Sequence, residues 1–195
     1  MKLLVFDTET GGLVPDTCGL TQVSAGVCEF TADYSSFEIV DSYSTVVREV
    51  PGLLYEDRAM EIQGRTREDL KNGVPVGVAI QGIEKLSTLH FGKPKAATPY
   101  GVNVKFDVDF VSASVNRHKL IMPFNFVYRD ICQWFRLLQD LGFHDCYKAN
   151  LDTIAQHYGI ELNRSERHDA IDDVRGTAEA ISRMMQEFRG KHVDS

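Results

Sequence analysis

Two acidic residues near the N-terminus have the spacing of a shared cation site. Asp7 and Glu9 follow the apolar run 3–6, which is typical of a buried central strand. Side chains alternate along a strand, so both carboxylates point to the same side. Like charges repel unless a cation lies between them, and hard oxygen ligands suit Mg²⁺ or Mn²⁺. The pair is therefore a candidate metal site. The alternative interpretation is a turn in which water solvates both acids.

A second acidic stretch lies in the middle of the chain. Residues 103–107, Asn-Val-Lys-Phe-Asp, have the pattern of the first turn of a helix. This places Asp107 close to the ends of the strands, with Asp109 as the competing acid. Favourable interaction with the helix dipole also explains an acid at this position.

A third stretch combines one histidine with several acids. In 168–174, His-Asp-Ala-Ile-Asp-Asp-Val, three acids fall within five residues, which core packing does not explain. An apolar helical stripe runs beside Asp173, formed by Ile171, Val174, Ala178 and Ile181. The alternative for His168 is a structural histidine on a charged helix face.

The elements that must position these residues alternate between strands and helices. Residues 22–30 and 36–48 are rich in β-branched and aromatic side chains and predict an antiparallel hairpin. Further predicted strands are 3–6, 95–100 and 124–128, and the predicted helices lie in 57–72 and at 76–91, 106–111, 131–141, 151–158 and about 169–188. This order favours one α/β domain with a mixed sheet.

Taken in order, the three motifs resemble those of the DnaQ-like exonucleases of the DEDDh group. Asp-Thr-Glu-Thr-Gly-Gly-Leu at 7–13 is similar to the first motif of that family and 103–107 to the second. His168, Ala170 and Asp173 match the third. The resemblance covers nearly the whole chain. It implies a single DnaQ-like exonuclease domain over 1–195, with an RNase H-like mixed central sheet of about five strands flanked by helices.

The resemblance also implies a reaction and the residues that perform it. Members of this family are 3′-to-5′ exonucleases that hydrolyse the terminal phosphodiester with two metal ions, Mg²⁺ or Mn²⁺. The family spacing selects Asp107 over Asp109 and Asp173 over Asp172, and it makes His168 the general base. The expected substrate is the 3′ end of single-stranded DNA, from which nucleoside monophosphates are released. The implied metal ligands are Asp7, Glu9, Asp107 and Asp173.

Contacts to the terminal nucleotide follow from the same resemblance. The positions that match are Thr8, Thr10, Gly11, Leu13, Met60, Gln63, Asn103 and Phe106. The chain departs from the family at two neighbouring positions, because members often carry His or Asn in place of Gln63 and Ile in place of Arg65. We therefore expect the contacts of this protein to the terminal nucleotide to differ from those of other family members.

Composition restricts how the chain binds nucleic acid. The chain has 21 basic and 28 acidic residues and a formal net charge of −7, which argues against coating nucleic acid by bulk attraction. Local capture of a strand end through metal ions is compatible with that charge. At 43% hydrophobic and 25% charged residues, wholesale disorder is excluded.

The cysteines and the apolar segments indicate a reducing compartment. Four cysteines without a Cys-x-x-Cys pair predict free thiols, and no apolar segment has the length of a membrane span, so we expect a cytoplasmic protein. The cysteines are Cys18, Cys28, Cys132 and Cys146.

Three alternatives stay open at this point. The same motifs serve an RNA-trimming exoribonuclease. A catalytically silent nucleic-acid-binding or scaffold module is disfavoured, because such a module is expected to have lost at least one of the four acids or His168. The third alternative is a proofreading subunit that binds a polymerase, or another replication or repair protein, through a surface patch.

Overall fold

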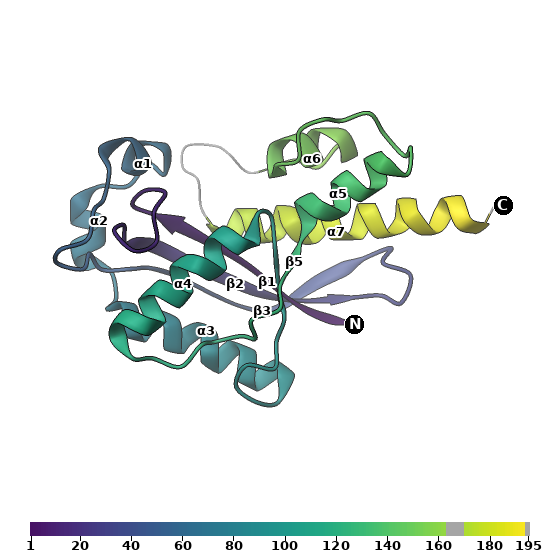
Figure 1. Cartoon of the computed structure of the whole chain (residues 1–195). Helices are drawn as coiled ribbons and strands as arrows, with labels where there is room; N and C mark the ends of the chain where they lie inside the picture. Colours follow the sequence, from purple (N-terminus) through teal and green to yellow (C-terminus); the bar gives the residue numbers. More distant parts are fainter. Residues whose placement is uncertain (163–169, 194–195) are drawn as a thin grey trace.

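Five strands form one mixed sheet in the order β3-β2-β1-β4-β5, in a computed structural model that describes residues 1–162 and 170–193 (Figure 1). β1, β2 and β3 pair antiparallel, whereas β4 runs parallel to β1 and β5 parallel to β4. The predicted mixed sheet is confirmed. The strands are β1 (Lys2–Thr10), β2 (Leu20–Phe30), β3 (Phe37–Val46), β4 (Pro99–Gly101) and β5 (Arg129–Asp130).

Helices cover both faces of this sheet (Figure 1). One face packs against α3 (Val76–Phe91) and α4 (Val104–His118). The other packs against α5 (Ile131–Asp140), α6 (Leu151–Tyr158) and α7 (Ala170–Val193). The short helices α1 (Asp57–Ile62) and α2 (Arg67–Asn72) lie in the connection between β3 and α3.

The apolar run in β1 is continuous because both of its faces are buried. Leu4 and Phe6 join the core beneath α3 and α4, whereas Leu3 and Val5 join the core beneath α5, α6 and α7. Alternation along the strand thus divides the side chains of β1 between two separate cores. The same alternation continues into the acidic residues that follow.

Helix ends follow local rules that the sequence carries. Thr66 and Asp69 form a reciprocal capping box at the start of α2. The side chain of Asn150 accepts a hydrogen bond of 2.8 Å from the backbone N–H of Thr153 and caps α6. Gly159 ends α6 with a φ of +64°, a conformation that is strained for residues with a Cβ.

Two predicted strands are wrong in extent. The strand expected at 95–100 is reduced to Pro99–Gly101, in part because Pro99 has no N–H to donate to a sheet ladder. Residues 124–128 form no strand, and β5 begins only at Arg129. Phe124 is buried against Phe6, and the side chain of Asn125 accepts from the backbone N–H of Val127 at 2.6 Å. This local turn takes the chain out of register with β4.

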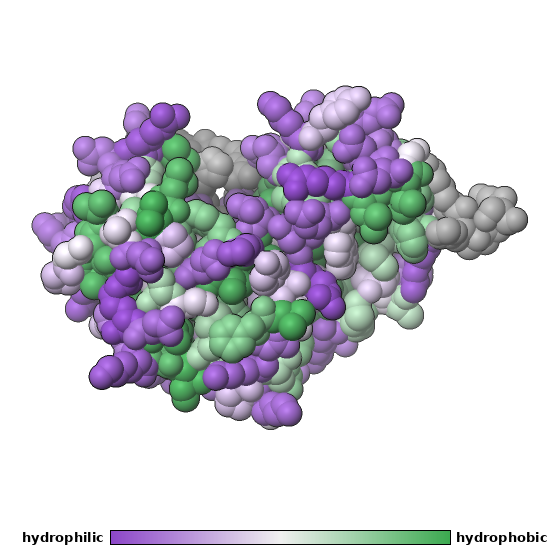
Figure 2. All heavy atoms as spheres, in the orientation of Figure 1, coloured by the Kyte–Doolittle hydropathy of each residue, from purple (hydrophilic) through white to green (hydrophobic). Residues whose placement is uncertain are grey.

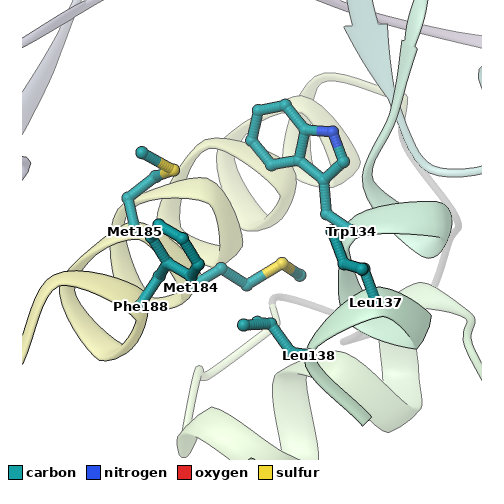
Figure 3. Close-up of a pocket in the computed structure, with 6 residues that line it drawn as sticks. All are labelled: Trp134, Leu137, Leu138, Met184, Met185 and Phe188. Carbon is teal, nitrogen blue, oxygen red and sulfur yellow. The ribbon is translucent and has the colours of Figure 1, made fainter. Parts of the chain in front are cut away.

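An apolar groove of about 190 Å³ lies between α5 and the C-terminal half of α7 (Figure 3). Its lining residues are Trp134, Leu137, Leu138, Met184, Met185 and Phe188. In Figure 2, apolar atoms gather where these two helices meet, and other apolar patches lie elsewhere on the same face. None of the described helices combines the length and apolarity needed to cross a membrane.

All four cysteines are free thiols, as expected, but their exposure differs. Cys18, Cys28 and Cys132 are buried, and burial raises the pKa of Cys28 to about 12 and that of Cys132 to about 11. Cys146 is partly exposed, with its sulfur 3.6 Å from Nδ1 of His157.

We predict that one thiol of the native protein reacts rapidly with a disulfide reagent at pH 8. Burial keeps the reagent away from Cys18, Cys28 and Cys132, and the raised pKa of Cys28 and Cys132 also leaves these two thiols protonated at this pH, so all three stay slow until the protein unfolds. Cys146→Ser should abolish the rapid phase and leave three thiols that react in guanidinium. Two or more rapid thiols in the native wild type would contradict the buried positions.

Candidate active site

Three carboxylates from two distant segments meet at the end of β1. Ligand oxygens of Asp7, Glu9 and Asp173 all lie within 4.8 Å of one another, and the three side chains are partly buried. Asp7 and Glu9 come from alternate positions of β1, and Asp173 comes from the first turn of α7. We call these three residues the acid cluster.

Close packing of α7 against β2 brings Asp173 to this position. A Cβ added to Gly26 would lie only 2.8 Å from Cγ1 of Val174, which is closer than real Cβ contacts. Gly26 pairs with Val5 on β1, two residues before Asp7. Because Asp173 directly precedes Val174, the missing side chain at Gly26 lets the helix bring its carboxylate to the strand.

The composition of the acid cluster fits a hard divalent cation. Carboxylates this close repel one another unless protons or a cation lie between them. An all-oxygen donor set favours Mg²⁺ or Mn²⁺ over softer metals. The cluster consequently has the chemistry of a magnesium or manganese site, with Asp7, Glu9 and Asp173 as the residues able to hold the ion.

Asp107 lies beside the same segment of β1 but is held differently. Its Oδ1 accepts hydrogen bonds from the backbone N–H of Thr8 at 2.9 Å and from the Thr8 hydroxyl at 2.7 Å. The last registered pair between β1 and β4 is Val5 with Tyr100, so the N–H of Thr8 is left for a side chain. Asp107, in the first turn of α4, occupies that position.

Burial is the main influence on the Asp107 carboxyl. It raises the pKa of Asp107 to about 7, while the two hydrogen bonds from Thr8 act in the opposite direction. A cation nearby would favour the ionised form and lower this pKa. Asp107 is therefore a fourth acid at the site, outside the cluster of three, whose charge depends on what binds beside it.

A cleft of about 560 Å³ opens next to Glu9. Leu13 is 78% exposed and Ile62 is 55% exposed, and both line this cleft together with Phe106. The full lining is Thr8, Glu9, Thr10, Gly12, Leu13, Glu56, Arg58, Ala59, Ile62, Gln63 and Phe106. An apolar rim beside acidic groups suits a ligand with a flat apolar part and an anionic part that binds through a metal.

The family resemblance placed Met60 and Gln63 of this segment at the terminal nucleotide, but sequence reasoning did not single out Arg58 and Ile62. These two residues are four positions apart on α1, which places them on one helix face toward the cleft. Glu56, which directly precedes α1, was also missed.

Several expected substrate contacts have structural partners. The Gln63 amide donates to the carbonyl of Thr10 at 2.7 Å and accepts from the Thr21 hydroxyl at 2.6 Å. Met60 is 5% exposed and packs with Tyr55 in a small apolar cluster. These contacts tie α1 to the end of β1.

Other expected contacts are placed by the backbone. A Cβ on Gly11 would lie 2.6 Å from the carbonyl oxygen of Leu54, so protein packing alone requires glycine there. Asn103 precedes α4 with a φ of +53°, and its backbone N–H donates to Oδ1 of Asp130 at 3.0 Å. His168 lies outside the described residues, and its role stays a prediction.

Comparisons with known proteins give one family and a set of solved folds. The RNase_T model, described as an exonuclease, matches residues 4–181. No curated protein matches the chain in sequence. Escherichia coli Exonuclease I in complex with a dT13 oligonucleotide is 19% identical, with a TM-score of 0.78, and the match covers 99% of this chain and 42% of that one.

Two further structures match over most of the chain. The nuclease domain of 3′hExo, a DEDDh family member bound to rAMP, is 14% identical with a TM-score of 0.76, covering 95% of this chain and 92% of that one. Cell-death related nuclease 4 is 17% identical with a TM-score of 0.76, covering 94% and 63%. The expected RNase H-like exonuclease fold is confirmed.

We predict that Mg²⁺ or Mn²⁺ stabilises the protein through the acid cluster. A ligand that binds only the folded state at about 100 times its Kd adds about 2.7 kcal/mol to the free energy of unfolding. Asp173→Asn removes one ligand and part of the repulsion. The variant should unfold no earlier than the wild type without metal, and its metal-induced shift in Tm should be smaller.

Differential scanning calorimetry with and without EDTA measures this effect. Asp140→Asn removes the same charge from an exposed position at the end of α5 and should keep the full metal-induced shift. An undiminished shift in Asp173→Asn would place the metal elsewhere.

Proposed function

This chain belongs to the RNase_T exonuclease family, and we propose that it removes nucleotides from the 3′ end of single-stranded nucleic acid, with DNA as its main substrate, by metal-dependent hydrolysis. The observation that carries the proposal is the acid cluster at the edge of a cleft with an apolar rim. The chain spans 42% of the length of the Exonuclease I chain that it matches, so the activity of that whole protein is not transferred by the fold.

The cleft has the dimensions and lining of a nucleotide pocket. Its volume of about 560 Å³ lies within the range of about 300–1,000 Å³ that is usual for small-molecule sites. Leu13, Ile62 and Phe106 offer apolar surface to a base, and base stacking on aromatic side chains contributes about 1–3 kcal/mol per base. Glu9 lines the cleft and belongs to the acid cluster, so a terminal nucleotide in the cleft would place its phosphate beside the metal ligands.

Residues of the chain would prepare the site for hydrolysis. Asp7, Glu9 and Asp173 would hold one or two Mg²⁺ or Mn²⁺ ions, and Thr8 fixes the Asp107 carboxylate beside them. Such ions lower the pKa of a bound water and neutralise charge that develops on the phosphate. His168 is proposed to take the proton from the attacking water, a role for which an imidazole with a pKa near 6.5 is suited at neutral pH.

DNA is the substrate that the similarities favour first. Exonuclease I is described in complex with dT13, whereas the nuclease domain of 3′hExo is described with rAMP bound. An enzyme separates the two classes by how its site treats the 2′-hydroxyl. Each assay is accordingly run with an RNA oligonucleotide in parallel with the DNA oligonucleotide.

We expect the acid cluster to be essential for turnover. Asp7→Ala and Asp173→Asn should each reduce cleavage of a dT oligonucleotide by at least about a hundredfold, because electrostatic stabilisation of the transition state is lost. Both variants should keep the circular dichroism spectrum of the wild type, and Asp140→Asn should keep wild-type activity.

The assay uses DNA and RNA oligonucleotides labelled at either end, with Mg²⁺ or EDTA. A 3′ exonuclease releases labelled mononucleotide at once from the 3′-labelled strand and shortens the 5′-labelled strand stepwise. Release from the 5′ end, or near-normal turnover in Asp7→Ala, would refute the proposal. Faster loss of RNA would favour the exoribonuclease, and binding without cleavage would favour the silent module.

His168→Ala is predicted to lower kcat by about 10²–10⁴-fold, which is the usual contribution of a general base. The limb of the pH–rate profile near neutral pH should disappear with it, because turnover requires the unprotonated imidazole and rises as pH passes its pKa. His118→Ala removes an exposed histidine at the end of α4 and should leave the profile intact. A surviving limb in His168→Ala would assign the base to another group.

A further inference from the structure

Arg65 is a partly buried cation close to the acid cluster, and it has no role in that cluster. It lies between α1 and α2, and its Nε is buried without a hydrogen-bond partner. Its Nη2 donates to Oε1 of Gln22 on β2. Within residues 1–162 and 170–193, no carboxylate forms an ion pair with this guanidinium.

The backbone holds Arg65 in one place. α1 ends at Ile62, and Gly64 follows with a φ of +59°. The N–H of Gly64 donates to the carbonyl of Glu61 at 3.0 Å, and the N–H of Arg65 donates to the carbonyl of Met60 at 2.9 Å. This pair of bonds is a Schellman motif, in which the chain reverses at a glycine. Arg65 is the residue that directly follows the reversal, so its side chain starts from a fixed point.

A row of polar side chains on β2 and β3 fixes the guanidinium from the other side. Gln22 is 3% exposed, and its Nε2 donates to the Ser44 hydroxyl at 3.0 Å. The Ser44 hydroxyl also shares a hydrogen bond of 2.7 Å with Ser24. The Gln22 amide is thereby oriented with its oxygen toward Arg65.

This arrangement places Arg65 one side chain away from the acid cluster. Gln22 pairs with Glu9 across β1 and β2, and Ser24 pairs with Asp7. Residues opposite each other in an antiparallel pair lie on one face with Cβ atoms about 4.5–5.5 Å apart. The guanidinium therefore lies on the face of the sheet that carries Asp7 and Glu9, on the side toward β3.

A buried N–H of a guanidinium is stable when an anion or another acceptor satisfies it. Arg65 has one neutral acceptor, Gln22, and a buried N–H that donates to no group. The guanidinium presents a planar fork that matches the oxygens of a phosphate. The anion that would come closest in a nuclease site is the phosphodiester of the bound strand.

We propose that Arg65 binds a phosphate of the nucleic-acid strand next to the acid cluster and so positions the strand for hydrolysis. This inference rests on the proposed function and extends it to a residue outside the metal site. In the absence of strand, Gln22 keeps the guanidinium in place. When strand is bound, the second amino group is available to a non-bridging phosphate oxygen, and a turn of the side chain toward the strand would bring the Nε–H to the same oxygen.

A salt titration of binding tests this contact without requiring turnover. In an Asp173→Asn background, which blocks cleavage, the affinity for a fluorescent dT oligonucleotide is measured by anisotropy at several KCl concentrations with Mg²⁺. Each phosphate contact to a single strand contributes about 0.7 to the slope of log K against log salt. Arg65→Gln should lower the slope by about 0.7 and the affinity by about ten- to a hundredfold.

Two matched variants separate this contact from a structural role. Arg183→Gln removes the same charge from the exposed side of α7, where it pairs with Glu179, and should change neither slope nor affinity. Arg65→Lys keeps the charge without the fork, so it should retain most of the slope and regain part of the affinity. If Arg65→Gln fails to fold, Arg65→Lys replaces it. Its turnover is then compared with that of the wild type on the methylphosphonate oligonucleotides described next.

Methylphosphonates locate the phosphate. Wild-type turnover should fall when one particular phosphodiester near the 3′ end carries a neutral methylphosphonate, and Arg65→Gln should then add no further loss. An equal penalty from Arg65→Gln on every substrate, or an unchanged salt slope, would overturn the inference. Absence of cleavage by the wild type would refute the proposed function alone, because the salt slope is measured without cleavage.

Discussion

The packing of α7 on β2 at Gly26 decides whether this protein has a site at all. Cγ1 of Val174 occupies space that any side chain at position 26 would need, and Asp173 is the residue directly before it on the helix. Glycine inside a strand costs conformational entropy and offers no side chain to pack. Here that cost lets a helix carboxylate approach the two carboxylates of β1. Core contacts around Val174 hold acids together that would otherwise separate by repulsion.

The acids near the end of β1 are held in two different ways. Asp7 and Glu9 lie on the face covered by α7, whereas the backbone and hydroxyl of Thr8 bind Asp107 from α4. This second contact depends on how short β4 is, because a longer β4 would have taken the N–H of Thr8 into the sheet ladder. β4 ends at Gly101 because the chain turns at Asn103 into α4, and this turn leaves the Thr8 N–H to Asp107.

Charge is distributed to suit local rather than general binding of nucleic acid. A net charge of −7 gives no broad attraction for a polyanion, and three of the acids are concentrated where metal ions would reverse the local sign. Arg65 adds a single oriented cation on the same face, held by Gln22 and by the backbone of α1. Binding by such a site is expected to depend on divalent cations and on a few phosphates near the strand end.

Local features of the sequence determined most elements, and the resemblance of the three motifs to a known family selected the acids. Strand alternation placed Asp7 and Glu9 on one side, and caps such as Thr66 and Gly159 set helix ends, because these effects act over a few residues. Only the tertiary structure decided the extent of β4, the docking of α1 beside the cleft and the place of Arg65 opposite Glu9. Those outcomes depend on contacts between residues far apart in sequence, and no local pattern encodes them.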